Sequence, residues 1–166
     1  MTTATQEKRI LACIDLTDEA DEVLRSAVEQ AEFYQSGDLH LISVVKPVAQ
    51  THGGLDAGAA SILAGVDARQ LSHAQELIND YARRYQISAD RCHIKLGHPA
   101  TEIRQLAQDL DVNLIVMGTH SRHGLGRLLG STANAVLHGV PCNVMMVRID
   151  TTQSQAPIQP KSKDAA

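Results

Sequence analysis

Short apolar segments alternate with helical patterns along almost the whole chain, and this alternation constrains the fold more than any other feature. Five segments have the length and branched apolar content of buried strands, and they cover residues 9–15, 39–45, 91–96, 112–117 and 143–149. Helical patterns separate them, after Thr17, over 61–85, from Pro99 to Leu110 and over 128–138. This order predicts an α/β fold, in which five parallel strands form one sheet and helices cover both of its faces.

The chain is long enough for one domain with a sizeable core. It has 166 residues, of which 43% are apolar, a normal share for a globular protein. Residues 48–60 are small and polar, which predicts a mobile loop. After residue 150 the sequence becomes polar and proline-containing, as is typical of disorder. We therefore expect a single folded domain over residues 1–150 and a disordered polar tail over residues 151–166.

The composition argues against two classes of partner. The formal net charge is −4 and aromatic residues make up only 2% of the chain, so neither an electrostatic grip on nucleic acid nor stacking on its bases is expected. No apolar run approaches the roughly 20 residues of a membrane span. The polar residues 1–9 lack the apolar stretch of a signal peptide. We expect a cytoplasmic protein with no membrane span.

The cysteines and histidines do not suggest a metal centre. Cys13, Cys92 and Cys142 are widely spaced and each lies in an apolar run, which predicts buried structural thiols. His120 and His123 are three residues apart, but no acid or cysteine lies near them in the sequence. No metal site is therefore expected.

The predicted topology places a ligand site beyond the carboxyl ends of the strands, where the strand order reverses. Asp15 ends the first strand there. Its carboxylate either hydrogen-bonds a ribose hydroxyl or an adenine amine, or it caps the helix and orders the loop. The loop after it is rich in acids and has no glycine, which argues against a dinucleotide fingerprint and against phosphate at this point.

The loop after the fourth strand has the opposite character. It carries glycines that let backbone N–H groups approach an anion, together with hydroxyl groups and a cation. These candidate residues are Gly118, Ser121, Arg122, Gly130, Ser131 and Thr132. No Asp or Glu occurs over residues 112–149, although the whole chain is net negative. The loop either binds a phosphate or is a glycine-rich connection whose arginines face water or a partner subunit.

No pattern of a catalytic site occurs in the chain. A P-loop and a Gly-x-Ser-x-Gly elbow are both absent from the sequence. Ser131 has no His and Asp partners in an arrangement that would activate it. We assign no catalytic residue, and an enzyme is not the expected function.

Longer stretches of the sequence resemble the universal stress protein family, of the bacterial type, over residues 7–149. The resemblance rests on three stretches: ILACIDLT from Ile10, LHLISVV from Leu39, and LIVMGTHSRHGLGRLLGSTANAVLHGVPCNVMMVR from Leu114. It implies a flavodoxin-like open sheet of five parallel strands in the order 3-2-1-4-5. It also implies a homodimer, usually formed through the last strands, and a cytoplasmic role in resisting stress.

ATP-binding members of this family share a glycine motif, which this chain matches in part. The motif is Gly, two residues, Gly, nine residues, then Gly followed by Ser or Thr. Here Gly118 is followed after two residues by Ser121, and eight further residues precede Gly130 and Ser131. A side chain at position 121 restricts the approach of the backbone to phosphate, and a shorter loop re-aims its amides.

The resemblance also implies which residues would line a nucleotide pocket. Asp15 and Val44 match the positions at the adenosine end, and Gly118, Gly130 and Ser131 match those at the phosphates. ATP or AMP is therefore a possible ligand of this chain.

Two functions remain open from the sequence. The first is a non-enzymatic, dimeric stress regulator that acts through an unknown protein partner and keeps a weak or vestigial nucleotide pocket. The second is a switch that binds ATP or AMP, with slow ATP hydrolysis or autophosphorylation on a residue such as Ser131. The imperfect motif favours the first, whereas the retained Gly130 and Ser131 and the acid-free stretch favour the second.

The last strand is the expected dimer interface. Val144, Met145, Met146 and Val147 make it apolar on both faces. An edge strand of this kind tends to aggregate unless it is covered, and pairing with a two-fold mate would cover it.

Overall fold

Five parallel strands form one sheet, and their order agrees with the alternation in the sequence. The computed structural model describes residues 8–35, 37–48, 57–120 and 130–149. The strands are β1 (Ile10–Cys13), β2 (Leu39–Val45), β3 (Cys92–Leu96), β4 (Leu114–His120) and β5 (Asn143–Ile149). Their order is β3-β2-β1-β4-β5 and every neighbouring pair is parallel. The predicted α/β fold with the strand order 3-2-1-4-5 is therefore confirmed.

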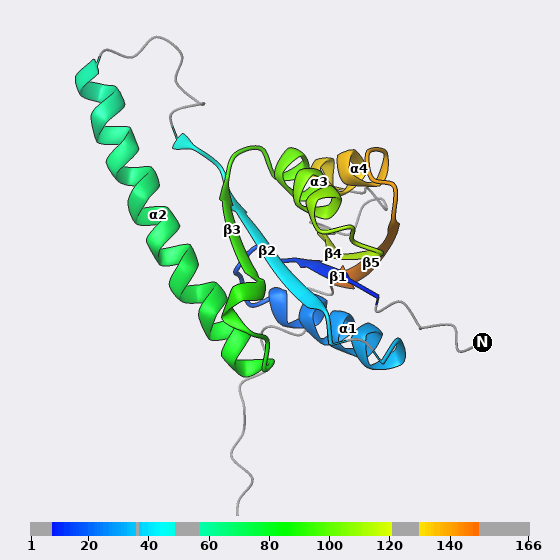
Figure 1. Cartoon of the computed structure of the whole chain (residues 1–166). Coiled ribbons are helices and arrows are strands. Elements are labelled where there is room, and N and C mark those ends of the chain that lie inside the picture. The colour runs from blue at the N-terminus through cyan, green and yellow to red at the C-terminus, as the bar shows by residue number, and fades with distance from the viewer. Residues whose placement is uncertain (1–7, 36, 49–56, 121–129, 150–166) are drawn as a thin grey trace, which may run out of the picture.

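Helices cover both faces of this sheet (Figure 1). They are α1 (Ala20–Phe33), α2 (Ala57–Arg84), α3 (Pro99–Asp109) and α4 (Ser131–Leu137), with a 3-10 turn η2 (Ala89–Arg91) before β3. Pro99 occupies the first turn of α3, where its missing N–H has no helical partner to lose. The first half of α2 extends past the carboxyl end of the sheet in Figure 1.

The sheet separates two apolar cores. Helices α1 and α2 pack on one face, where Leu24, Leu41 and Ile78 are fully buried. Helices α3 and α4 pack on the other face, around Leu11 and Ile115. Successive residues of β1 alternate between the two cores, as the two-residue period of a strand requires.

Several element boundaries differ from those that the sequence predicts. Helix α1 begins at Ala20 rather than directly after Thr17, because the Thr17 hydroxyl bonds to Asp15 and does not cap the helix. Strand β4 begins at Leu114 and continues to His120, since its extended end pairs with β5. Helix α2 begins at Ala57, so the mobile loop expected over residues 48–60 is wrong for its last four residues.

Two other expectations have different outcomes. Cys13, Cys92 and Cys142 are free thiols, as expected, but each is half-buried rather than fully buried. The tail over residues 151–166 lies outside the described residues. Within the described ranges, no helix is long and apolar enough to cross a membrane.

Candidate functional site

A cavity of about 360 Å³ lies at the carboxyl edge of the sheet. This volume is at the lower end of the roughly 300–1,000 Å³ of ligand pockets. The ends of β1, β2 and β4 line it together with the beginnings of α3 and α4. The strand order reverses here, because β2 and β4 lie on opposite sides of β1. The cavity therefore occupies the position where open α/β sheets bind ligands.

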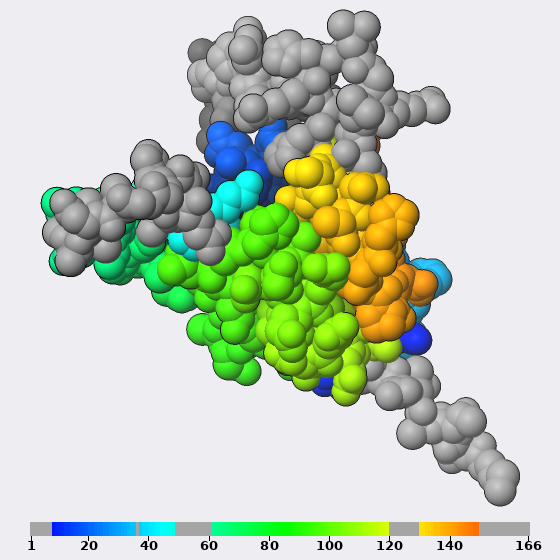
Figure 2. Space-filling model, turned by 90° about the horizontal axis from the view of Figure 1, so that it is seen from above, coloured from blue at the N-terminus to red at the C-terminus, as the bar shows by residue number. Residues whose placement is uncertain are grey.

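The structure brings together most of the residues that the sequence singles out. Asp15, Val44, Gly118, Gly130, Ser131 and Thr132 all line the cavity. Figure 2 looks down on this edge, where the segment after β1, the end of β2 and the start of α4 come close together. Ser121 and Arg122 lie outside the described residues, as does the rest of the glycine loop.

The loop that carries Asp15 is held in an unusual backbone conformation. Leu16 has a φ of 60°, in the left-handed region that favours glycine. The Asp15 carboxylate accepts hydrogen bonds from the hydroxyl of Thr17 at 2.8 Å and from its backbone N–H at 3.3 Å. Asp15 therefore orders the loop, which is one of the two roles considered for it. Its carboxylate is also exposed at the cavity, so the ligand role stays open.

Aliphatic side chains form the walls of the cavity. Ile42, Val44, Ile103 and Met117 contribute to them from β2, α3 and β4. Among the described lining residues there is no aromatic ring. A flat base in this cavity would therefore be held between aliphatic groups rather than stacked on a ring.

The two glycines of the cavity have different structural roles. A Cβ at Gly118 would clash with Cδ1 of Ile149, so a side chain here would force Ile149 to shift between β4 and β5. A Cβ at Gly130 would have no atom of the described residues within 4 Å. Gly130 has a φ of −58°, which any residue can adopt. No local constraint of the described fold therefore requires glycine at 130.

One residue of the cavity was missed in the sequence. Lys46 follows β2, and its side chain is the one cation among the described lining residues. Its position at the carboxyl end of a parallel strand was the available signal, because such ends gather at one edge of the sheet.

Cys13 lies at the floor of the cavity but is not a reactive thiol. Burial, and to a smaller extent the neighbouring Cys142, strongly raises the pKa of Cys13. Because the thiolate is the nucleophilic form, this side chain acts as a small apolar group.

The four candidate interface residues of β5 are packed within the chain itself. Val144 and Met146 contact the core under α3 and α4, whereas Met145 and Val147 contact the core on the side of α1. All four are half-buried. In the part of the chain that the structure describes, no strand pairs with the outer edge of β5. The dimer stays a prediction, and its contact surface would be that backbone edge.

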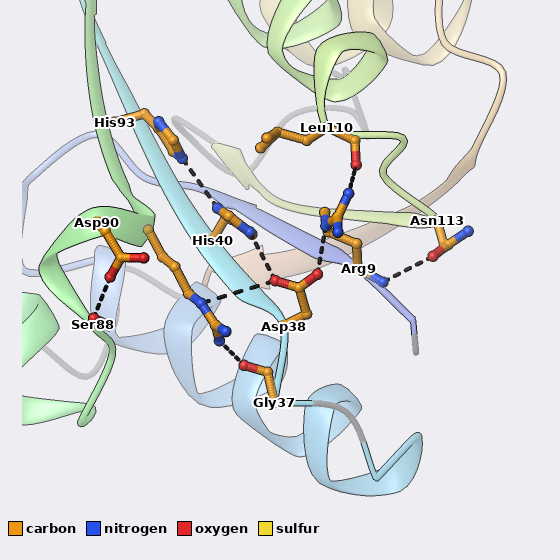
Figure 3. Close-up of polar contacts among 10 residues, drawn as sticks. Arg9, Gly37, Asp38, His40, Ser88, Asp90, His93, Leu110 and Asn113 are labelled. Atoms are coloured by element: carbon orange, nitrogen blue, oxygen red, sulfur yellow. Dashed lines mark hydrogen bonds and ion pairs between the residues drawn. The ribbon is translucent and has the colours of Figure 1, made fainter. Parts of the chain in front are cut away.

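A second polar cluster lies at the opposite, amino edge of the sheet (Figure 3). Asp38 forms ion pairs with Arg9 and with His40, whose Nε2 lies 2.9 Å from Oδ1 of Asp38. Nδ1 of His40 lies 3.1 Å from Nε2 of His93. Burial alone would raise the pKa of Asp38, but its hydrogen bonds from Arg9 and His40 hold that pKa below its ordinary value.

This second cluster connects segments that are distant in the sequence. Arg9 also donates to the carbonyl of Leu110, and its backbone N–H donates to the Asn113 side chain at 2.8 Å. These bonds tie the start of β1 to the turn between α3 and β4. No group of three or more potential metal ligands occurs among the described residues. The hydrogen bonds of the cluster join the starts of β1 and β2 to β3 and to the turn before β4.

Sequence comparison places the chain in a known family. The model of the universal stress protein family matches residues 7–148. The chain belongs to that family. This universal stress protein is 35% identical to universal stress protein A homolog 2 of Coxiella burnetii over 144 residues, which cover 86% of this chain and 95% of the relative. It is 34% identical to homolog 1 of the same organism over 142 residues, which cover 84% and 95%.

Solved structures agree with this assignment. Universal stress protein UspA from Lactobacillus plantarum has a TM-score of 0.68 and 25% identity to this universal stress protein, and the match covers 85% of this chain and 97% of that one. A universal stress protein solved in complex with cAMP has the same fold, with a TM-score of 0.54, 21% identity and coverage of 87% and 98%.

Proposed function

We propose that this universal stress protein is a non-enzymatic stress regulator that binds an adenine nucleotide in the cavity at the carboxyl edge of its sheet. The observation that carries the proposal is the cavity itself, because six of the eight residues selected from the sequence line it. A vestigial pocket would be expected to be filled by side chains. The described residues leave this cavity open, and among those that line it are one carboxylate, one cation and two hydroxyl-bearing residues.

The positions of the apolar and polar side chains around the cavity fit an adenosine group that carries phosphate. Aliphatic walls suit a base and a sugar, and the carboxylate of Asp15 can accept from a ribose hydroxyl or an adenine amine. Ser131 and Thr132 offer hydroxyl donors on the other side. AMP and ATP are both candidate ligands, and AMP, with one phosphate, is the simpler probe.

A second candidate function is a regulator that acts through protein contacts without any nucleotide. It is favoured by Ser121, which stands where ATP-binding relatives have glycine, and by the loop that is one residue shorter. Both changes would weaken phosphate binding, because they alter the backbone amides that approach the anion.

One set of measurements separates the two functions. The purified protein is denatured and its supernatant is analysed for ATP, ADP and AMP by chromatography. The nucleotide-free protein is then titrated with AMP, ATP and adenosine by calorimetry. Bound nucleotide in stoichiometric amount, or micromolar binding, supports the proposal. If none of the three ligands gives a heat of binding at millimolar concentration, the nucleotide-binding function is refuted and the regulator that acts through protein contacts alone is supported.

The cellular setting belongs to the same proposal. We place the protein in the cytoplasm as a homodimer, with an unidentified protein as its partner. The support is the family assignment and the apolar composition of β5 at the sheet edge.

A further inference from the structure

The loop that carries Asp15 is hydrogen-bonded to a side chain of helix α2. The loop that presents Asp15 contains Leu16 at a φ of 60°. A left-handed conformation is unfavourable for a residue with a branched side chain, and it persists only where the surrounding structure imposes it. The bonds from Thr17 to Asp15 lie within the loop. The backbone N–H of Ala20 donates to the carbonyl of Thr17 at 2.9 Å and ties the loop to the start of α1, and Leu16 packs against the core on that side of the sheet.

Tyr81 attaches this loop to helix α2. Its hydroxyl donates to the carbonyl of Thr17 at 2.7 Å, across 64 positions of sequence. The Tyr81 ring is only 7% exposed and packs in the core under α1 and α2. Burial, together with the nearby Asp21, raises the pKa of Tyr81, so its hydroxyl remains a donor at physiological pH. The guanidinium of Arg84 lies 4.4 Å from the ring centroid and covers it.

Tyr85, the residue that follows the end of α2, supplies a matched comparison. Tyr85 donates its hydroxyl to the carboxylate of Asp21 at 2.8 Å, and so it attaches α2 to helix α1. Asp21 does not line the cavity. Tyr81 near the end of α2 and Tyr85 directly after it each donate one hydroxyl hydrogen bond to the α1 side of the molecule, but only that of Tyr81 reaches the loop beside the cavity.

We propose that Tyr81 is a positioning residue of the nucleotide site, which fixes the loop of Asp15 through the carbonyl of Thr17 and links occupancy of the cavity to helix α2. This inference rests on the proposed function. Without the hydroxyl, the loop loses this tie to α2, and only the Ala20 N–H, at 2.9 Å, remains among the donors that the described residues supply to the Thr17 carbonyl. Because coupling between sites is reciprocal, a nucleotide that engages Asp15 also stabilises the last turns of α2.

The first test compares affinities. AMP is titrated into the wild-type protein and into the variants Tyr81→Phe and Tyr85→Phe, each of which loses one hydroxyl. We expect Tyr81→Phe to raise the dissociation constant by about three- to tenfold, the effect of one hydrogen bond. Tyr85→Phe should change it by less than about twofold, while the midpoints of thermal unfolding of the two variants fall by similar amounts.

The second test separates positioning from a general loss of stability. In the background Asp15→Ala, the additional change Tyr81→Phe should have no further effect on AMP affinity, because Tyr81 acts through Asp15. AMP should also slow amide hydrogen exchange in residues 78–84 of the wild-type protein but not of Tyr81→Phe. Additive losses in the double variant, or equal affinities of Tyr81→Phe and Tyr85→Phe, would overturn the inference.

A negative result with the wild-type protein has a separate meaning. If wild type binds neither AMP nor ATP, the proposed function fails and the role of Tyr81 in it fails too. If wild type binds and the two tyrosine variants behave alike, only the role of Tyr81 is refuted.

Discussion

At the scale of single residues, the cavity has sites where a substitution should change binding without disturbing the fold. Gly130 and Lys46 are such sites. A side chain at 130 would enter open space, and Lys46 is exposed at the rim. Effects on ligand affinity can therefore be measured there on a folded protein.

Gly130→Val is expected to abolish measurable nucleotide binding or to weaken it by about tenfold or more, because its branched side chain would occupy the side of the cavity where a phosphate would lie. Gly130→Ala, with a single methyl group, should cause a smaller loss. Calorimetric titration with AMP measures both. Unchanged affinity of the valine variant would show that the nucleotide does not lie against residue 130.

Lys46→Ala should weaken ATP binding by about two- to fivefold, since an exposed ammonium group contributes modestly to holding a phosphate. Affinity for adenosine, which has no phosphate, should stay within about twofold. Lys95→Ala is the matched control, because Lys95 is exposed at the end of β3 and does not line the cavity. Equal losses with ATP and adenosine would contradict a phosphate contact.

At the scale of elements, the contact between β4 and β5 depends on the absence of a side chain at one position. Gly118 pairs with Val147 in the sheet, and the terminal methyl group of Ile149 fills the space where a Cβ would lie. Ile149 is 4% exposed and belongs to the core on the side of α1. Gly118 therefore contributes to stability as well as to the wall of the cavity.

Gly118→Ala should lower the free energy of unfolding by about 1–3 kcal/mol, because Ile149 must move to accept the added methyl group. Gly65→Ala gives a control of opposite sign. A Cβ at Gly65, in the interior of α2, meets nothing within 4 Å, and the substitution should stabilise the helix by about 0.5–1 kcal/mol. Urea denaturation measures both, and a neutral Gly118→Ala would refute this packing role.

At the scale of the whole molecule, two features concern stability and assembly. The polar cluster at the amino edge joins the starts of β1 and β2 to β3 through buried or half-buried charged groups. The outer edge of β5 is the surface where a second copy is expected. The first feature predicts how stability depends on pH, and the second predicts how the protein behaves in sedimentation.

Stability should fall when the pH drops below about 6.5. Burial, followed by the neighbouring His40 and Lys95, holds the pKa of His93 below its ordinary value of 6.5. Below pH 6.5 the unfolded chain therefore binds a proton at His93 more readily than the folded protein does. The contribution of neutral His93 to the free energy of unfolding is present above pH 6.5 and is lost as the pH falls below it. Asp38 does not contribute in this range, because its own pKa lies below 3.8.

Urea denaturation at about pH 7.5 and about pH 5.5 tests this dependence. His93→Gln keeps a side-chain amide that can donate to Nδ1 of His40 but does not titrate. We expect the variant to lose less stability than wild type over the same interval. Identical losses in the two proteins would rule out His93 as the cause.

The protein should sediment as a dimer at micromolar concentration. β5 is an edge strand of the described sheet, and an uncovered edge strand promotes aggregation. Two-fold pairing through the backbone edge of β5 would cover this edge. A single species of monomer mass, constant over a range of concentrations, would contradict the interface.

The architecture followed from the sequence because it depends on local periodicity. Strands β2 and β5 have the predicted bounds, and α3 begins at Pro99 as expected, since apolar runs and proline act within a few residues. The start of α1 was misplaced because Thr17, a common helix cap, bonds to Asp15 instead. Whether the Thr17 hydroxyl bonds to Asp15 or caps the helix depends on the conformation of the whole loop.

By itself, the sequence pattern determined that five strands form a parallel sheet with helices on both faces and that a ligand site would form at its carboxyl edge, whereas the strand order was an implication of the family resemblance. These depend on apolar patterning and on the chain connectivity of parallel strands. The tertiary structure decided which side chains meet. It set Tyr81 against the carbonyl of Thr17, Ile149 against Gly118 and His40 against His93. Each of these contacts joins segments that are far apart in the chain, and their distance in space depends on how whole elements pack rather than on any local pattern.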